Sequence, residues 1–274
     1  MKRMAEILVP RPAATVTLVR DTSPGFEVLM VQRNFKSIFM PGMHVFPGGG
    51  VDAHDASPDI AALCDGLDDA AASKRLGIAK GGQAYWVAAV REAFEEAGIL
   101  LACDAAGKTI MLDDAERAAR FHAYRQRVEH GEHPFADMLK GEGLRLPLTR
   151  MKYFSHWITP VGAPRRYDTR FFVAEAPAAQ QPLHDNRETI NHVWVKPAEA
   201  LAKNKLKQFD MRTPTVHTLK LFAQHDSVAA LIKALDALGS IPVIEPRIAK
   251  NGRRLLPGDP GYEAAGAPEG RGVY

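Results

Sequence analysis

Two stretches near the start of the chain alternate hydrophobic and polar positions. Residues 14–20 (ATVTLVR) and 26–33 (FEVLMVQR) are rich in β-branched side chains and flank the turn-forming segment DTSPG. Because successive side chains of a strand point to opposite faces, this period of two predicts a pair of strands joined as a hairpin. A short run at 44–46 (HVF) predicts a further strand. The three glycines at 48–50 then predict a loop whose backbone can approach a ligand closely.

A helical pattern dominates the middle of the chain. Residues 83–101 predict a long helix that ends near Gly98, and 113–130 and 135–140 predict two more. The other expected elements are helices at about 60–74, 197–203, 213–222 and 227–238, and strands at 170–175, 190–195 and 241–248. A chain of 274 residues with 46% hydrophobic content has the material for one large α/β domain or two small ones.

Three carboxylates lie close together in the helix predicted at 83–101. Glu92, Glu95 and Glu96 are spaced i, i+3 and i+4, which places them on one face. The other face is apolar and carries Trp86, Val87, Val90, Phe94 and Ala97. Like charges four residues apart repel by roughly 0.2–0.5 kcal/mol, which either solvent or a divalent cation can offset. Arg91, four residues before Glu95, offsets part of the repulsion.

Composition and charge name no partner. The 35 basic and 32 acidic residues leave a formal charge of +3, which is too small for this length to indicate nucleic acid or an anionic membrane. Cys64 and Cys103 have no metal-ligand spacing around them, so neither a disulfide framework nor a structural zinc site is expected. The N-terminal residues lack the apolar core of a secretory leader, and no apolar run is long enough to span a membrane. We therefore expect a cytoplasmic protein.

The glycine-rich turn and the acidic helix together resemble a known motif. VFPGGGVD and REAFEEAGI are similar to the Nudix box, in which a Gly is followed after five residues by a Glu and, seven residues later, by REUxEExGU, with U aliphatic. Arg91, Glu92, Glu95, Glu96 and Gly98 stand at the matching positions. By this resemblance the chain is identified as a member of the Nudix hydrolase family, which favours the metal-binding interpretation of the acidic helix.

The box is interrupted in this chain. Counted back from Arg91, the position of the first Glu holds Gln83, which is neutral. The box separates its Gly from its Arg by about fourteen positions, whereas Gly49 and Arg91 are 42 positions apart, an excess of 28 residues. An insertion at this place is typical of the Nudix branch that includes the peroxisomal coenzyme A diphosphatases. The stretches VLMVQRNFKSIFMPGMHVFPGGGVD, HWITPVGAPRRYDTRFFVAE and RRLLPGD also resemble that branch.

The resemblance implies a fold and a domain plan. We expect a Nudix α/β/α sandwich with a mixed sheet and helical insertions. A single Nudix domain is expected over residues 1–261, with an insertion at about 52–82 and a helical elaboration at about 113–140. Residues 262–274, which are rich in Gly and Ala, are expected to form a flexible C-terminal tail.

The resemblance also implies roles for individual residues. Mg²⁺ or Mn²⁺ is expected on Glu92, Glu95 and Glu96, because hard cations prefer oxygen ligands. The other expected site residues are Arg91, which orients a glutamate, Glu188 as the general base, Gly48 and Gly49 in the turn, and Arg33, Arg165 and Arg166 on phosphate groups. Alternatively, Glu188 is a surface loop residue and Glu95 or Glu96 is the base.

These roles imply metal-dependent hydrolysis of a nucleoside diphosphate linked to another group. The branch resemblance favours coenzyme A or acyl-coenzyme A, split into 3′,5′-ADP and the 4′-phosphopantetheine part. The same chemistry on ADP-ribose, NADH or another nucleotide is one alternative, and a Nudix module that binds a nucleotide without cleaving it is another. An unrelated α/β protein with a solvated acidic helix is the third. The expected partner is a small-molecule nucleotide, not nucleic acid or a membrane, and a homodimer is left open.

Overall fold

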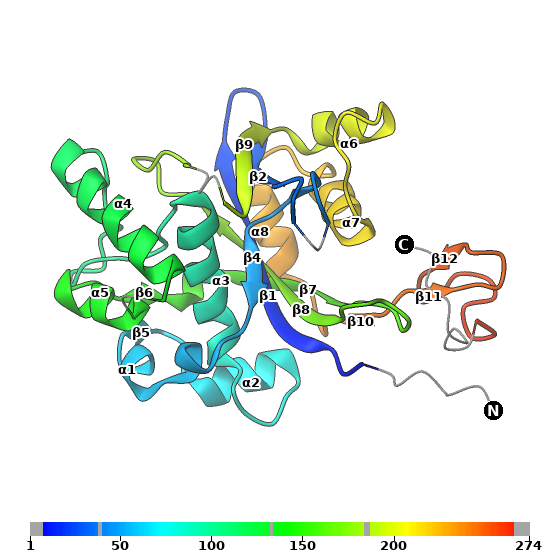
Figure 1. Cartoon of the computed structure of the whole chain (residues 1–274), viewed down its shortest axis with the longest axis horizontal. Coiled ribbons are helices and arrows are strands. Elements are labelled where there is room, and N and C mark those ends of the chain that lie inside the picture. The colour runs from blue at the N-terminus through cyan, green and yellow to red at the C-terminus, as the bar shows by residue number, and fades with distance from the viewer. Residues whose placement is uncertain (1–7, 38–39, 132–133, 184–186, 266–274) are drawn as a thin grey trace.

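A mixed sheet of eight strands forms the centre of the part of the chain that the structure describes (Figure 1). The structure is a computed structural model that describes residues 8–37, 40–131, 134–183 and 187–265. The strand order is β10-β7-β8-β1-β2-β3, with β4 also paired to β1 and β9 to β2. The strands are β1 (Arg11–Asp21), β2 (Phe26–Arg33), β3 (His44–Val45), β4 (Gly48–Gly50), β7 (Lys152–Ile158), β8 (Tyr167–Glu175), β9 (Thr189–Val195) and β10 (Val243–Ile244).

The N-terminal strands confirm the predicted hairpin, since β1 and β2 pair antiparallel. Strand β1 begins earlier than predicted, at Arg11, because it also pairs in parallel with β8, where Arg11 lies beside Tyr167. The short strand expected at 44–46 is confirmed as β3. The glycines at 48–50 were predicted as a loop, and this is wrong. They form β4 and pair antiparallel with β1, which holds Gly49 in a regular ladder.

Helices cover both faces of the sheet, which confirms the α/β/α sandwich (Figure 1). One layer contains α3 (Gln83–Ala97), α4 (Ala115–Glu129) and α5 (Phe135–Gly141), and the other contains α6 (Pro197–Lys205), α7 (Thr213–Phe222) and α8 (Val228–Asp236). Alternate residues of β8 point to opposite layers. Phe172 packs on Trp86 of α3 with ring centroids 4.6 Å apart, whereas Phe171 and Val173 belong to the core under α7 and α8.

The central helix α3 has well-defined ends. At its N-terminus the carboxylate of Asp69 accepts hydrogen bonds from the backbone N–H groups of Gly81 and Gln83, at 2.9 and 3.0 Å. At its C-terminus Gly98 takes a left-handed φ of 67°, which L side chains rarely adopt, and the chain turns away. The helix therefore stops at Ala97 and is shorter than the predicted span.

The segment predicted as an insertion folds into several short elements. They are η1 (Ala53–Ala56), α1 (Pro58–Ala61), β5 (Cys64–Asp65), which pairs with β6 (Leu146–Pro147), and α2 (Asp69–Leu76). Gly66, with a φ of 75°, turns the chain between β5 and α2, and Asp68 caps α2 by accepting from the N–H of Ala71 at 2.8 Å. The prediction of one helix at 60–74 is therefore wrong.

The helices α4 and α5 confirm the two helices predicted at 113–130 and 135–140. Phe121 of α4 and Phe135 of α5 belong to the same apolar core as α3. Arg125 of α4 donates from Nε to the backbone oxygen of Glu95 at 2.8 Å. Both helices therefore pack as part of the α3 layer, and Arg125 contacts the turn of α3 that carries the acidic residues. A 3₁₀ turn, η2 (Leu148–Arg150), follows β6.

The C-terminal region corrects two predictions. The strand expected at 241–248 is split at Pro246, because proline cannot donate to a strand ladder. Strand β10 pairs with β7, while β11 (Arg247–Ile248) pairs with β12 (Arg254–Leu255). The flexible tail was expected from residue 262, but Tyr262 is buried and its hydroxyl donates to Glu245 O at 2.8 Å. Residues 266–274 of that tail lie outside the described residues. Within the described part, no helix has the length and apolar character needed to cross a bilayer.

Candidate active site

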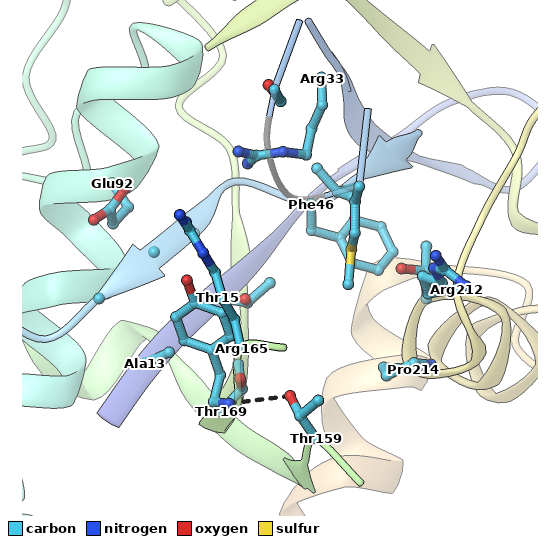
Figure 2. Close-up of a pocket in the computed structure, with 18 of the residues that line it drawn as sticks. Ala13, Thr15, Arg33, Phe46, Glu92, Thr159, Arg165, Thr169, Arg212 and Pro214 are labelled. Atoms are coloured by element: carbon cyan, nitrogen blue, oxygen red, sulfur yellow. Dashed lines mark hydrogen bonds between the residues drawn. The ribbon is translucent and has the colours of Figure 1, made fainter. Parts of the chain in front are cut away.

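A pocket of about 1060 Å³ opens where the C-terminal half of α3, strand β4 and the loops after β2 and β7 meet (Figure 2). The N-terminus of α7 forms part of its wall. All but one of the predicted site residues line it: Arg33, Gly48, Gly49, Arg91, Glu92, Glu95, Glu96, Arg165 and Glu188. The fold thus brings residues from distant parts of the sequence to one cavity.

Arg91 donates several hydrogen bonds on the α3 side of the pocket. Its side chain is largely buried, and Nη1 donates to Oε1 of Glu92 at 2.8 Å and to Oε1 of Glu95 at 3.2 Å. The expected contact between Arg91 and Glu95 is therefore confirmed. Nη2 donates to the backbone oxygen of Gly50 at 2.8 Å, which ties the helix to β4. A planar guanidinium with five donors can serve all these acceptors at once.

Asp55 is a site residue that the sequence analysis missed. It accepts a bidentate pair from Arg91, Nε to Oδ1 at 2.9 Å and Nη2 to Oδ2 at 3.0 Å, and its side chain is 1% exposed. Counting forward from Gly49 would have found it, because five residues separate the two, as the box requires of its Gly and its first acid. Counting back across the insertion led instead to Gln83. Gln83 does not line the pocket, and its amide donates to Leu67 O at 2.7 Å.

The contacts of Arg91 also involve the start of the segment predicted as an insertion. Asp52 Oδ2 lies 3.6 Å from Arg91 Nη2, and Asp55 is paired with Arg91 as described above. Asp52 and Asp55 therefore belong to the site, although both lie within the segment predicted as an insertion at about 52–82. The two halves of the box are adjacent in space although 28 additional residues separate them in sequence.

Glu96 is the most deeply buried of the three glutamates, with 4% of the residue exposed. Its Oε2 accepts the backbone N–H of Gly48 at 3.0 Å, and its Oε1 lies 3.6 Å from Arg33 Nη1. The hydroxyl of Thr189 also donates to its backbone oxygen at 3.1 Å. Glu96 therefore joins α3 to β4, β2 and β9 at the floor of the pocket.

Burial makes the glutamates unusually weak acids. It raises the pKa of Glu92 to about 7, against the attraction of Arg91. It also raises the pKa of Glu96 well above the usual range, with the nearby charge of Glu92 adding to the effect, and it raises that of Glu95. Carboxylates that are buried side by side repel each other, and a bound cation would relieve that repulsion.

The three glutamates do not converge on one point. Among the described residues, no group of three or more His, Cys, Asp or Glu side chains is arranged to hold a metal ion. Glu92 and Glu95 each direct one oxygen to Arg91, and Glu96 directs one to Gly48. Basic and backbone donors already engage one oxygen of each carboxylate, so the metal site on Glu92, Glu95 and Glu96 stays a prediction. The donor set itself, three carboxylates with one oxygen each beyond these bonds, suits a hard cation.

Gly49 is the point of closest approach between β4 and the acidic helix. A Cβ atom on Gly49 would lie 2.5 Å from Oε1 of Glu92, far inside van der Waals contact. A Cβ on Gly48 would lie 2.5 Å from the backbone oxygen of Ala14. A side chain at Gly48 would push β4 away from β1, and one at Gly49 would displace the carboxylate of Glu92.

Replacing Gly49 with Ala is expected to lower kcat by roughly 10²-fold, because it displaces the carboxylate of Glu92 by about an ångström. Steady-state kinetics on the best substrate measure the loss. Gly50→Ala is the matched control, since a Cβ there meets nothing within 4 Å. Equal activity of the two variants would show that the close packing at Gly49 is unimportant.

The remaining predicted residues separate into two groups. Glu188 has a side chain 56% exposed, and its Oε2 is 3.9 Å from Arg33 Nη2. Arg165 is exposed, and Figure 2 shows its side chain extending over the pocket towards the side that carries Glu92. Arg166 is the exception. It is buried and donates to Thr159 O at 2.9 Å, Leu8 O at 2.7 Å and Glu245 Oε1 at 2.5 Å, so its assignment to phosphate is corrected to a structural role.

The opposite wall of the pocket was not predicted from the sequence. It includes Arg212, Thr213, Pro214, Thr215 and Arg254. The helix at 213–222 was predicted correctly, but no local pattern shows that its N-terminus faces the acidic helix. That placement depends on how both layers pack on the sheet.

The hydrogen bonds of Arg91 join α3, β4 and η1, so the two separated halves of the Nudix box are adjacent in space. This box is the signature of a Nudix hydrolase. Residues 70–221, more than half of the chain, match the family described as "NUDT19 Nudix domain", so the chain belongs to the Nudix hydrolase family. Within that family it falls in the NUDT19 branch.

Relatives of that branch cover most of the chain. "Acyl-coenzyme A diphosphatase NUDT19" of Gallus gallus is 29% identical over 302 residues, which cover 92% of this chain and 79% of the relative. The protein of the same name from Homo sapiens is 29% identical over 87% of this chain and 72% of its own length. Among solved structures, a NUDIX hydrolase from Alicyclobacillus acidocaldarius is similar with a TM-score of 0.68 at 26% identity, covering 85% of this chain and 99% of that one. This similarity confirms the Nudix fold.

Proposed function

We propose that this protein hydrolyses the diphosphate bond of coenzyme A or an acyl-coenzyme A, giving 3′,5′-ADP and the (acyl) 4′-phosphopantetheine part. The observation that carries the proposal is the similarity to acyl-coenzyme A diphosphatases over most of the chain, including the helix whose glutamates face the pocket. The pocket of about 1060 Å³ lies at the upper end of the usual range for ligand pockets, as a large nucleotide requires.

We propose Mg²⁺ or Mn²⁺ as the cofactor, held by Glu92, Glu95 and Glu96. These side chains supply oxygen donors, which hard divalent cations prefer. When bound, the cation supplies Lewis-acid stabilisation of the charge that develops on the diphosphate oxygens. That all three side chains line the same pocket supports the proposal.

The chain's own groups would divide the remaining work. Arg91 holds Glu92 and Glu95 in fixed orientations through its hydrogen bonds. Arg33 and Arg165, on the pocket wall, would contact the diphosphate, since guanidinium groups match phosphate oxygens in pairs. Glu188, whose side chain is exposed at the rim of the pocket, would accept the proton of the attacking water.

Metal binding is expected to become stronger as the pH rises. The folded pKa of Glu92 is about 7 and its ordinary value is 4.5, so between these pH values the folded metal-free chain holds more protons than the unfolded chain. The free energy of unfolding of the metal-free protein therefore falls as the pH rises through this window. Thermal unfolding at about pH 5 and about pH 8 should show a larger Mg²⁺-induced rise in Tm at the higher pH. An equal rise at both would contradict metal binding at these carboxylates.

Product analysis tests the proposed activity directly. Purified protein is incubated with Mg²⁺ and, in parallel, with coenzyme A, ADP-ribose or NADH, and the products are separated by mass. Formation of 3′,5′-ADP and 4′-phosphopantetheine from coenzyme A is the expected result. Cleavage of ADP-ribose or NADH with coenzyme A left intact would support the alternative substrates. Binding of a nucleotide without cleavage of any would support a non-catalytic module.

A further inference from the structure

The charges that line the pocket are divided between its two sides. The lining acids are Asp52, Glu92, Glu95, Glu96, Glu129 and Glu188. All belong to the α3 side: Asp52 lies beside Arg91, while Glu129 and Glu188 are close enough to raise the pKa values of Glu95 and Glu92. Among the described lining residues, the α7 side contributes two cations, Arg212 and Arg254, and no carboxylate.

The two cations come from segments that meet at the start of α7. Arg212 immediately precedes the helix, and Arg254 of β12 donates from Nη1 to the hydroxyl of Thr213 at 2.7 Å. Figure 2 shows Arg212 and Pro214 on the side of the pocket opposite Glu92. None of the described residues forms a hydrogen bond or an ion pair with the guanidinium of Arg212. The N-terminus of α7 adds the partial positive charge of the helix dipole.

Two cations of the α3 side, Arg91 and Arg33, already have other acceptors. Arg91 forms ion pairs with Asp55, Glu92 and Glu95. Arg33 lies between Glu96 and Glu188, at 3.6 and 3.9 Å. Any group that these arginines contact is also near the acidic cluster. A separate dianion on the substrate would be repelled there, and the α7 side is where the lining charge is positive.

We propose that Arg212, Arg254 and the first turn of α7 form a subsite for a second phosphate group of the nucleotide, a phosphate monoester distinct from the diphosphate that is cleaved. This inference rests on the proposed function, because coenzyme A carries such a group on its ribose and ADP-ribose and NADH do not. A phosphate monoester is a dianion, and arginine forms its strongest hydrogen bonds with such groups. The subsite therefore favours nucleotides that carry the additional phosphate monoester over counterparts that lack it.

Kinetics on coenzyme A and dephospho-coenzyme A test the subsite. The wild-type protein should prefer coenzyme A, and Arg212→Ala should lower kcat/KM for coenzyme A by roughly 10- to 100-fold, mainly through KM. The same variant should affect dephospho-coenzyme A far less. Arg212→Lys keeps the charge and should recover part of the preference. Arg253→Ala, at an exposed residue next to Arg254 that does not line the pocket, is the matched control and should change neither substrate.

Equilibrium binding separates failure of the subsite from failure of the proposed function. Calorimetry compares 3′,5′-ADP with 5′-AMP on the wild-type protein and on Arg212→Ala. Tighter binding of 3′,5′-ADP that is lost in Arg212→Ala supports the subsite even if coenzyme A is not hydrolysed, in which case the proposed activity alone is wrong. Equal binding of the two nucleotides to the wild-type protein, or an equal loss of both in the variant, overturns the subsite whatever the protein hydrolyses.

Discussion

Glu96→Gln is expected to reduce kcat by roughly a thousandfold while leaving the fold intact. The amide keeps the shape of the side chain and its oxygen can still accept the N–H of Gly48, so the link between α3 and β4 survives. It carries no negative charge, however, and is a poor ligand for a hard cation. Because the variant also removes the repulsion between Glu92 and Glu96, thermal stability should be equal to or above that of the wild type in the absence of metal.

Kinetics and metal titration distinguish this loss from a general effect of losing a glutamate. Glu175→Gln, at the exposed end of β8, is the matched control and should retain full activity. Calorimetric titration with Mn²⁺ should show weaker binding only for Glu96→Gln. Turnover by Glu96→Gln close to that of the wild type would show that the acidic helix takes no part in the mechanism. Nucleotide binding by a wild-type protein that shows no turnover would favour the non-catalytic module.

Arg91→Ala is expected to lower the free energy of unfolding by about 3–5 kcal/mol, because it leaves the buried carboxylate of Asp55 without its cation. For a protein of this size the corresponding fall in Tm is on the order of 10 °C. Activity should also collapse, since Glu92 and Glu95 lose the donor that orients them. Arg91→Lys should recover only part of both, because an ammonium group cannot form the bidentate pair with Asp55.

A double-mutant cycle isolates the contact between Arg91 and Asp55. Asp55→Ala alone should also destabilise the protein, but Arg91→Ala combined with Asp55→Ala should cost much less than the sum of the two single changes. Denaturant unfolding of the four proteins gives the coupling energy. Additive effects would mean that the two side chains stabilise the protein independently, and that Asp55 is not the structural counterpart of the first acid of the box.

The local elements were predictable where a regular pattern repeats. The hairpin of β1 and β2 and the helix α7 follow from alternation or helical period within each segment. Strand β7 was not predicted, because most of its residues are buried and it shows no regular alternation of buried and exposed positions. The glycines of β4 were predicted as a loop, because their strand conformation depends on pairing with β1, which no local pattern reveals.

The acidic helix illustrates both what was predictable and what was not. Spacing alone placed Glu92, Glu95 and Glu96 on one face, and the contact of Arg91 with Glu95 followed from the same period. The sequence indicated that this face points away from the core towards solvent or a cation. The structure turns this face into the pocket beside β4, where the three side chains are largely buried and desolvation raises their pKa values. Burial depends on neighbours that are distant in sequence.

By itself, the sequence determined the box residues of α3, the resemblance to the Nudix family and most of the regular elements, because each depends on the order of residues within a short segment. Only the tertiary structure decided which acid completes the box, since Asp55 and Arg91 meet across 28 additional residues. It also decided that Arg166 is structural and that Arg212 and Arg254 face the pocket. These outcomes depend on how the two helical layers pack on one sheet. The spacing of residues within a short segment does not reveal such long-range packing.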